Sequence, residues 1–313
     1  MDLRQLHYFL TTVECRNFGR AAQVLNVSQP ALSKAVRRLE EDLGVKLLDR
    51  LPRGVSPTLF GEALAAHANL ISGELTRARD AITALRSGQS GRVVVGAGSS
   101  MRLELLPEAI VRLTKNCPDV DVEVVGELYD DLLPDLKNGL LDLTLSMIPS
   151  SSHNDEIDYT ALYVDKTHPT VRVGHPLTQK SKPTVEECLD YVWILPSSEN
   201  LGRRHLDAYF LHRNLQAPAP KIETNSTMFC VNVLRKSDLI GWHPTQVIGQ
   251  AEQTGLVALP IDEITLTRTV GITTRSNSVL SPAAVLLIEE LKNVSEDMIQ
   301  SGKVMPLQTE GAV

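Results

Sequence analysis

The sequence predicts a mainly helical N-terminal domain with a helix-turn-helix, then one long linker helix, then a two-lobed α/β domain. Three observations support this fold class. Apolar residues between positions 3 and 43 recur at helical spacing on both sides of a short polar turn. Residues 58–87 contain no proline and only two glycines. From residue 92 onward, short β-branched segments alternate with amphipathic helical segments, as in α/β domains.

Length and composition limit the possible classes of protein. A chain of 313 residues with 42% hydrophobic content predicts at least two cores. No apolar run approaches 18 residues, and the N-terminus lacks the layout of a secretory signal, so we expect a cytoplasmic protein without a membrane span. The four cysteines are far apart and form no C-x-x-C pair, which favours reduced, packed thiols over a zinc site or disulfides.

The net charge of −7 is unevenly distributed along the chain. Residues 1–60 hold nine Lys and Arg against six Asp and Glu, whereas the remainder is acidic. A mildly basic segment joined to an acidic one is typical of a nucleic-acid reader fused to another module.

The first sixty residues contain the signals of two capped helices. Asn17 can cap the first of these helices, and Asn26 tolerates the left-handed backbone that the following turn requires. Ser28 can cap the second helix, Pro30 falls in its first turn, and Gly44 ends it. The residues expected to face inward are Phe18, Ala21, Ala22, Leu25, Leu32, Val36, Leu39 and Leu43.

The outward face of the second helix suits contact with double-stranded DNA. Glutamine can pair with adenine through two hydrogen bonds, serine can reach a base edge or a phosphate, and lysine and arginine neutralise phosphates. The DNA-binding candidates in the two helices are Arg20, Ser28, Gln29, Pro30, Ser33, Lys34, Arg37 and Arg38.

A hairpin follows the second helix. Residues 45–50 predict a strand, Pro52-Arg53-Gly54 a turn, and residues 55–58 a returning strand. Such a hairpin is a candidate wing, from which Arg50 and Arg53 could reach the DNA backbone or minor groove.

These motifs together resemble the N-terminal signature of LysR-type transcriptional regulators. The resemblance is carried by Asn17-Phe18, Ala21-Ala22, Leu25 to Ser33, Leu39-Glu40, Leu43-Gly44, Leu47 to Arg50, Thr58 and Gly61. It implies a winged helix-turn-helix, a dimerising linker helix and an effector domain like a periplasmic binding protein. It also implies that Gln29, Pro30 and Ser33 lie near bases and Arg53 on the wing. Gly19 departs from the hydroxyl residue common at its position, and the position of Lys34 varies in the family.

The linker helix carries an apolar seam at alternating spacings of three and four residues. Its members are Phe60, Leu64, Ala68, Ile71, Leu75, Ala78, Ile82 and Leu85. Such a seam is typical of a coiled coil, so we expect the helix to pair with a second copy. The resemblance to the LysR family implies that the assembly is a homodimer or a homotetramer. The alternative is a single helix lying on the rest of the chain.

The remaining sequence predicts two lobes joined by two crossovers. The expected domains are 1–58, 59–87, a hinge at 88–91, an effector-binding domain at 92–303 and a flexible tail at 304–313. Lobe I is expected at about 92–163 and 268–303, and lobe II at about 164–267. The order of segments from 92 to 147 predicts a parallel sheet covered on both faces, followed by strands at 160–164 and 170–174.

Ligands of such sheets bind at the carboxyl ends of strands, near helix N-termini. Loops at these places predict an effector site for a small molecule, for which a small organic anion is a candidate, and no other cofactor. For any single residue, a helix-capping role is the alternative. The candidates are Ser99, Ser100, Met101, Ile148, Pro149, Ser197, Ser198, Asn200, Thr224, Asn225, Ser226 and His243.

The sequence contains no signature of an enzyme. Gly96-Ala97-Gly98 lacks the third glycine of a dinucleotide loop, and no nucleophile elbow, phosphate loop or metal-ligand spacing is present. We therefore expect a regulator in which effector binding shifts the lobes, moves the DNA-binding domains and alters contact with RNA polymerase. Two alternatives are a cytoplasmic solute-binding protein whose N-terminal helices contact other proteins, and a redox sensor using Cys188 and Cys230.

Overall fold

The computed structural model describes residues 1–52, 54–87, 90–126, 129–149, 155–249 and 254–307. The chain divides into two compact units, residues 1–82 with 138–140, and residues 83–137 with 141–313. Each unit has its own hydrophobic core. Within the described ranges, no helix combines the length and the apolar content needed to cross a membrane.

The first unit is a helical cluster with a β-hairpin. Its elements are α1 (Leu3–Cys15), α2 (Phe18–Val24), α3 (Gln29–Leu43), β1 (Leu48–Leu51), β2 (Gly54–Pro57) and most of α4 (Leu59–Ser87). The predicted hairpin is confirmed, because β1 and β2 pair antiparallel. Its first strand begins at Leu48 and not at residue 45, because the backbone N–H of Leu47 donates to the Glu40 carboxylate at 2.9 Å.

The predicted caps fix the helix-turn-helix. The Asn17 side chain accepts a hydrogen bond from the Arg20 backbone N–H at 3.0 Å, and Ser28 Oγ accepts from Ala31 at 3.3 Å. Asn26 and Gly44 have φ of 52° and 69°, the left-handed conformation expected at both positions. Both α2 and α3 therefore begin where the sequence predicts.

The seam of α4 divides into two parts. Ala68 is buried against Leu6 and Leu10 of α1, and Leu64 packs on the same cluster. The seam residues left exposed are Phe60, Ile71, Leu75, Ala78 and Ile82. The expectation that the whole seam packs against a second copy is therefore wrong for Leu64 and Ala68, which pack into the core of the first unit. The side chain of Leu85 lies outside the described residues.

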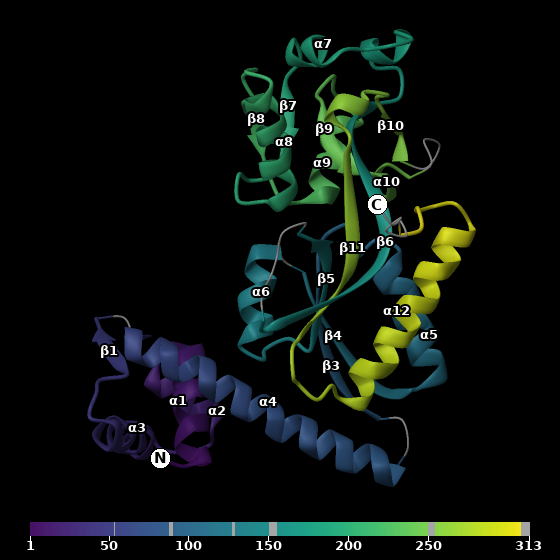
Figure 1. The fold of residues 1–313 in the computed structure, drawn as a ribbon. Helices are drawn as coiled ribbons and strands as arrows, with labels where there is room; N and C mark the ends of the chain where they lie inside the picture. The colour runs from purple at the N-terminus through teal and green to yellow at the C-terminus, as the bar shows by residue number, and fades with distance from the viewer. Residues whose placement is uncertain (53, 88–89, 127–128, 150–154, 250–253, 308–313) are drawn as a thin grey trace. The chain divides into compact units, whose positions relative to one another are not determined.

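The second unit contains the remaining elements, which Figure 1 labels. The elements up to the first long strand are β3 (Ser90–Ala97), α5 (Leu105–Asn116), β4 (Asp119–Val125), α6 (Tyr129–Lys137), β5 (Leu143–Ile148) and β6 (Ile157–Arg172). Those that follow are η1 (Pro176–Gln179), α7 (Val185–Leu189), β7 (Trp193–Leu195), α8 (Leu201–His212), β8 (Pro220–Glu223), α9 (Thr227–Leu234), β9 (Gly241–Pro244) and α10 (Thr245–Ile248). The last elements are β10 (Leu256–Ala258), η2 (Asp262–Ile264), β11 (Leu266–Arg275) and α12 (Pro282–Gln300).

The central sheet is mixed, and the parallel arrangement predicted for the segments from 92 to 147 is confirmed in β3, β4 and β5. Strand order is β10-β6-β11-β5-β3-β4, with β9 also paired to β6. Only β4, β3 and β5 are parallel to one another, whereas β11 is antiparallel to both β5 and β6. Helices α5 and α12 cover one face of β3–β5 and α6 the other (Figure 1), so the expected cover on both faces is confirmed.

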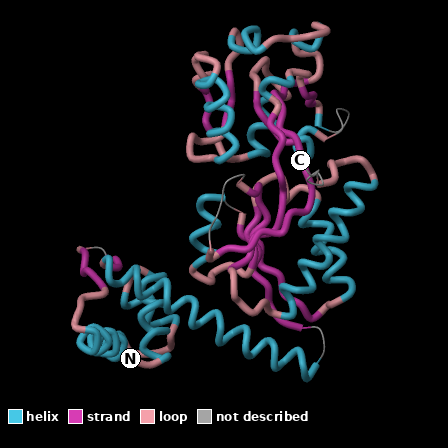
Figure 2. The backbone as a smooth tube through the Cα atoms, viewed as in Figure 1, coloured by secondary structure: helices cyan, strands magenta, loops and turns pink. Residues whose placement is uncertain are grey.

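Two long strands connect the lobes. The strands expected at 160–164 and 170–174 are one strand, β6. This strand continues through Pro169, whose carbonyl oxygen still accepts a hydrogen bond from the Leu259 backbone N–H at 2.8 Å. Strand β11 runs antiparallel beside it (Figure 2). Lobe I is defined here as β3–β5 with α5, α6 and α12, and lobe II as β7–β10 with α7–α10.

The ends of the second unit differ from the expectation. Two residues of the expected hinge, Ser90 and Gly91, begin β3, and the other two lie outside the described residues. Residues 304–313 were expected to be flexible, but Val304 is buried and Met305 exchanges two backbone hydrogen bonds of 2.9 Å with Val164. That expectation is wrong for residues 304 and 305, because the apolar Val304 side chain joins the core of lobe I.

Candidate functional site

The outward face of α3 presents the predicted DNA-contacting side chains in two stripes. Gln29, Ser33 and Arg37 recur every fourth residue, and Pro30, Lys34 and Arg38 form the adjacent stripe. All six are exposed except Ser33, which is half-buried. The opposite face buries Leu32, Val36 and Leu39, whereas Leu43 is 40% exposed, so its predicted burial is wrong because the last turn of α3 extends past the core.

The hairpin is tied to α3 by Glu40, a contact that the sequence did not reveal. The Glu40 Oε1 accepts hydrogen bonds from the backbone N–H groups of Leu47 at 2.9 Å and Leu48 at 3.3 Å. The Arg50 guanidinium lies 5.8 Å above the centre of the Phe18 ring of α2. These contacts give the hairpin a defined position beside α3.

A shallow groove lies between α3 and the hairpin. It is lined by Ser33, Arg37 and Arg50 among others, so three predicted residues converge there. Arg20 is exposed on α2, and the Ser28 side chain is occupied as a helix cap. Arg53 lies outside the described residues.

A cavity of about 150 Å³ lies between the two lobes of the second unit. Lobe I contributes the loop after β3 and the end of β5, and lobe II contributes the first turns of α8 and α9, strand β9 and α10. The lining residues that the sequence predicted are Ser99, Ser100, Met101, Asn200, Thr224, Asn225 and His243. A cavity of about 150 Å³ has room for a molecule of about one six-membered ring.

Five predicted effector residues do not line this cavity. Ile148 and Pro149 line a separate shallow depression together with Tyr159 and His205. The Ser226 hydroxyl caps α9 by accepting from the Phe229 N–H at 3.3 Å, as the capping alternative proposed. The Ser197 backbone N–H donates to Asn225 Oδ1 at 3.0 Å, and Ser198 is exposed. The loops therefore contribute fewer lining side chains than their composition suggested.

One polar residue of the cavity, Ser146, was not predicted from the sequence, whereas His243 was. Ser146 of β5 and His243 of β9 line it, and both are at least nine-tenths buried. Ser146 Oγ and His243 Nδ1 have no hydrogen-bond partner. Buried polar atoms are nearly always paired, so these two atoms are the strongest indication of a ligand. No local sequence signal marks Ser146, because its environment depends on the antiparallel pairing of β5 with β11.

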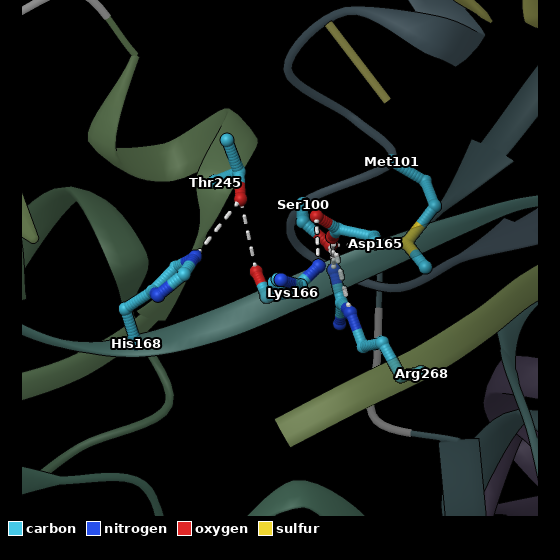
Figure 3. Close-up of polar contacts among 7 residues, drawn as sticks. All are labelled: Ser100, Met101, Asp165, Lys166, His168, Thr245 and Arg268. Carbon is cyan, nitrogen blue, oxygen red and sulfur yellow. Dashed lines mark hydrogen bonds and ion pairs between the residues drawn. The ribbon is translucent and has the colours of Figure 1, made fainter. Parts of the chain in front are cut away.

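An ion pair forms part of the cavity wall (Figure 3). Arg268 of β11 lines the cavity, and its Nη2 lies 2.7 Å from Asp165 Oδ2 on β6 and 2.9 Å from Ser100 Oγ. The Asp165 side chain is only 1% exposed. The pair joins the two long strands to the loop after β3.

Burial also controls titration around the cavity. It lowers the pKa of His243 to about 4, so this imidazole is neutral near pH 7. Burial raises the pKa of Cys230, which also lines the cavity, to about 11, and that of Cys188 to about 12. Both thiols therefore stay protonated, a state that argues against the redox alternative.

Two helices begin at the cavity. Asn200 and Ser226 cap α8 and α9 by accepting from the third N–H of each helix. The earlier N–H groups of each first turn remain available, and a helix N-terminus attracts oxygen atoms that carry negative or partial negative charge. The cavity thus combines hydroxyl, imidazole and backbone N–H groups with an apolar remainder that includes Met101, Leu201 and Val247.

Comparison with protein families gives two matches along the chain. Residues 3–62 match the bacterial regulatory helix-turn-helix protein of the lysR family, and residues 86–296 match the LysR substrate binding domain. The chain is 29% identical over 308 residues to the HTH-type transcriptional regulator GbpR of Azospirillum brasilense, covering 98% of this chain and 90% of that protein. It is 27% identical over 312 residues to the HTH-type transcriptional regulator PcaQ of Agrobacterium fabrum, covering 99% and 98%.

Solved structures share the fold. Full-length OxyR from Pseudomonas aeruginosa, with one cysteine replaced by aspartate, has a TM-score of 0.70 at 22% identity, covering 93% of this chain and 98% of that chain. Full-length CbnR complexed with its target DNA has a TM-score of 0.66 at 18% identity, covering 94% and 100%.

Proposed function

The chain belongs to the LysR family of bacterial DNA-binding transcriptional regulators, and we propose that α3 and the β1–β2 hairpin read promoter DNA under control of a small effector in the interlobe cavity. The observation that supports effector control best is the pair of buried, unpartnered atoms, Ser146 Oγ and His243 Nδ1, on two residues that line the cavity. A ligand would supply their missing hydrogen bonds.

In the proposed complex with DNA, α3 lies in the major groove. Gln29 and Ser33, on one stripe, contact base edges near Pro30, and Lys34, Arg37 and Arg38 contact phosphates. Arg20 and Ser28 lie at the groove edge, and Arg50 and Arg53 reach the backbone from the hairpin. CbnR, which shares the fold, has been solved with its target DNA.

The proposed regulator is a homodimer or homotetramer. Exposed Ile71, Leu75 and Ile82 belong to the part of the α4 seam that the first unit does not cover. Pairing through this part would bury it and would give two DNA-binding units for two half-sites. Effector binding would then shift the lobes, move these units and change contact with RNA polymerase, provided that the effector prefers one arrangement.

Two measurements test the proposal. A gel-shift titration of the full chain against promoter fragments and scrambled DNA, at several salt concentrations, measures sequence preference. A thermal-shift screen with small organic acids, sugars and amino acids then identifies ligands, and each hit is repeated on His243→Phe. Equal affinity for scrambled DNA contradicts DNA reading, and hits that shift His243→Phe as much as the wild type contradict binding in the cavity.

A further inference from the structure

The charge inside the interlobe cavity is already neutralised by the protein. Among the described residues that line the cavity, Arg268 is the one side chain with a full charge near pH 7, because burial keeps the His243 imidazole neutral. The net charge of the cavity therefore depends on what the guanidinium of Arg268 contacts.

Three of the five N–H donors of Arg268 are committed to the protein. Its Nε lies 3.2 Å from Asp165 Oδ2, and its Nη2 donates to Asp165 Oδ2 at 2.7 Å and to Ser100 Oγ at 2.9 Å. An anionic ligand that took the guanidinium would leave the buried Asp165 carboxylate without its cationic partner, which is strongly unfavourable. An anion that left the pair intact would instead place a second negative charge close to Asp165.

Two other cations near the cavity, Arg203 and Lys166, do not supply a free charge to it. The Arg203 guanidinium, at the start of α8, donates to Asp207 Oδ1 at 2.8 Å and to the Pro196 carbonyl at 3.3 Å. Lys166 follows Asp165 on β6, so its side chain leaves the strand on the face opposite to Asp165, and it is not a lining residue.

The polar atoms left without partners suit an uncharged molecule. A serine hydroxyl such as that of Ser146 can donate or accept, and a neutral imidazole such as that of His243 can do both through its two nitrogens. The N–H groups at the starts of α8 and α9 can donate to a carbonyl or hydroxyl oxygen as well as to a carboxylate.

From these contacts we infer that the effector is an uncharged molecule bearing hydroxyl, carbonyl or amide groups, and that Asp165 sets this preference by neutralising Arg268. The inference rests on the proposed function of the cavity. It replaces the small organic anion that the sequence suggested as a candidate.

The test uses sulfate as a probe anion, because it needs no knowledge of the natural effector. Sulfate binding to the full-length chain is measured by titration calorimetry at constant ionic strength, in the wild type, in Asp165→Asn and in Asp165→Asn/Arg268→Gln. A matched control is Asp238→Asn, which frees Arg172 from an exposed ion pair of 2.7 Å elsewhere in the second unit. Sulfate bound by the basic first unit is common to all variants and cancels in the comparison.

We expect Asp165→Asn to gain a sulfate site at least tenfold tighter than any in the wild type, and the double variant to lose it. Asp238→Asn should resemble the wild type. A wild-type sulfate site that the double variant lacks would overturn the inference, and so would an Asp165→Asn variant that folds and gains no site. If Asp165→Asn does not fold, Asp165→Ser carries the same comparison.

Failure of the inference can be told apart from failure of the proposed function. If anions prove to be the ligands, the His243→Phe control of the effector screen still reports binding in the cavity. If the hits shift the melting temperature of His243→Phe as much as that of the wild type, the cavity is not the effector site, whatever the sulfate titration gives.

Discussion

Asp165 and Arg268 are cross-strand partners on β6 and β11, and their side chains form an ion pair with 2.7 Å between Oδ2 and Nη2. These two strands are the long connections between the lobes, so a change in the angle between the lobes would alter the geometry of the pair. Ser100 extends the contact to the loop after β3, whose neighbours Ser99 and Met101 line the cavity. The cavity wall and the connecting strands therefore share one polar cluster.

Breaking this pair on one side should destabilise the second unit. We expect Arg268→Leu to lower the free energy of unfolding by about 3–5 kcal/mol, because it leaves a buried carboxylate unpaired. The double variant Asp165→Leu/Arg268→Leu should recover most of that loss, since no buried charge remains. Urea unfolding of the two variants and the wild type measures both values. A double variant less stable than Arg268→Leu would mean that the pair itself stabilises the fold.

The two stripes of α3 should differ in their effect on DNA recognition. We expect Gln29→Ala to weaken binding to the specific site by about 1–3 kcal/mol and to relax the base preference at one position, with little effect on random DNA. Arg38→Ala should weaken both equally and reduce the salt dependence by about one phosphate contact. Titrations on specific and scrambled DNA at three salt concentrations measure the difference. Equal losses for Gln29→Ala on the two DNAs would remove its base-reading role.

The exposed part of the α4 seam should hold the oligomer together. We expect Leu75→Asp to shift the assembly towards monomers, because a charged side chain would be buried in the paired seam. Thr76→Asp is the matched control, since this exposed residue lies away from the seam. Sedimentation velocity at several concentrations measures the distribution of species. If Leu75→Asp and Thr76→Asp behave alike, the copies do not pair through this seam.

Helix caps and turns could be predicted from the sequence, because they depend on residues within about four positions along the chain. The caps Asn17 and Ser28 and the turn residue Asn26 act on atoms close in the chain, so their roles could be read directly. The Asp165–Arg268 pair joins residues 103 apart and depends on strand register, which no local pattern specifies. For the same reason the alternation of segments does not reveal that β11 pairs antiparallel with both β5 and β6.

The buried histidine of the cavity should make stability depend on pH. The pKa of His243 is lowered to about 4 in the folded chain, against about 6.5 when unfolded. Its contribution is fully present above pH 6.5, because neither state then binds the proton, and it is lost as pH falls towards 4, where only the unfolded state binds it. The expected loss approaches about 1.4 kcal/mol per pH unit in that window.

Urea unfolding of the wild type and of His243→Gln at pH 7 and pH 5 checks this dependence. His168 and His175 have pKa values that burial shifts in the same direction, so part of the slope should persist in the variant. An unchanged slope in His243→Gln would mean that the imidazole is already protonated, or exposed to solvent, in the folded chain.

Ser146 should show opposite effects on stability and on ligand response. Its Oγ is buried without a partner, so Ser146→Ala removes an unsatisfied group, and we expect the ligand-free chain to gain up to about 1–3 kcal/mol. The same change should weaken effector binding, because one hydrogen bond to the ligand is lost.

Ser295→Ala is the matched control. Ser295 is equally buried, but its Oγ donates to the Lys292 carbonyl at 2.8 Å, so loss of this hydroxyl should not stabilise the chain. Calorimetric melting without ligand, followed by titration with a hit from the effector screen, separates the two effects. A Ser146→Ala variant that melts earlier than the wild type and binds the hit equally well would contradict both expectations, and would mean that the hydroxyl serves the fold and not the ligand.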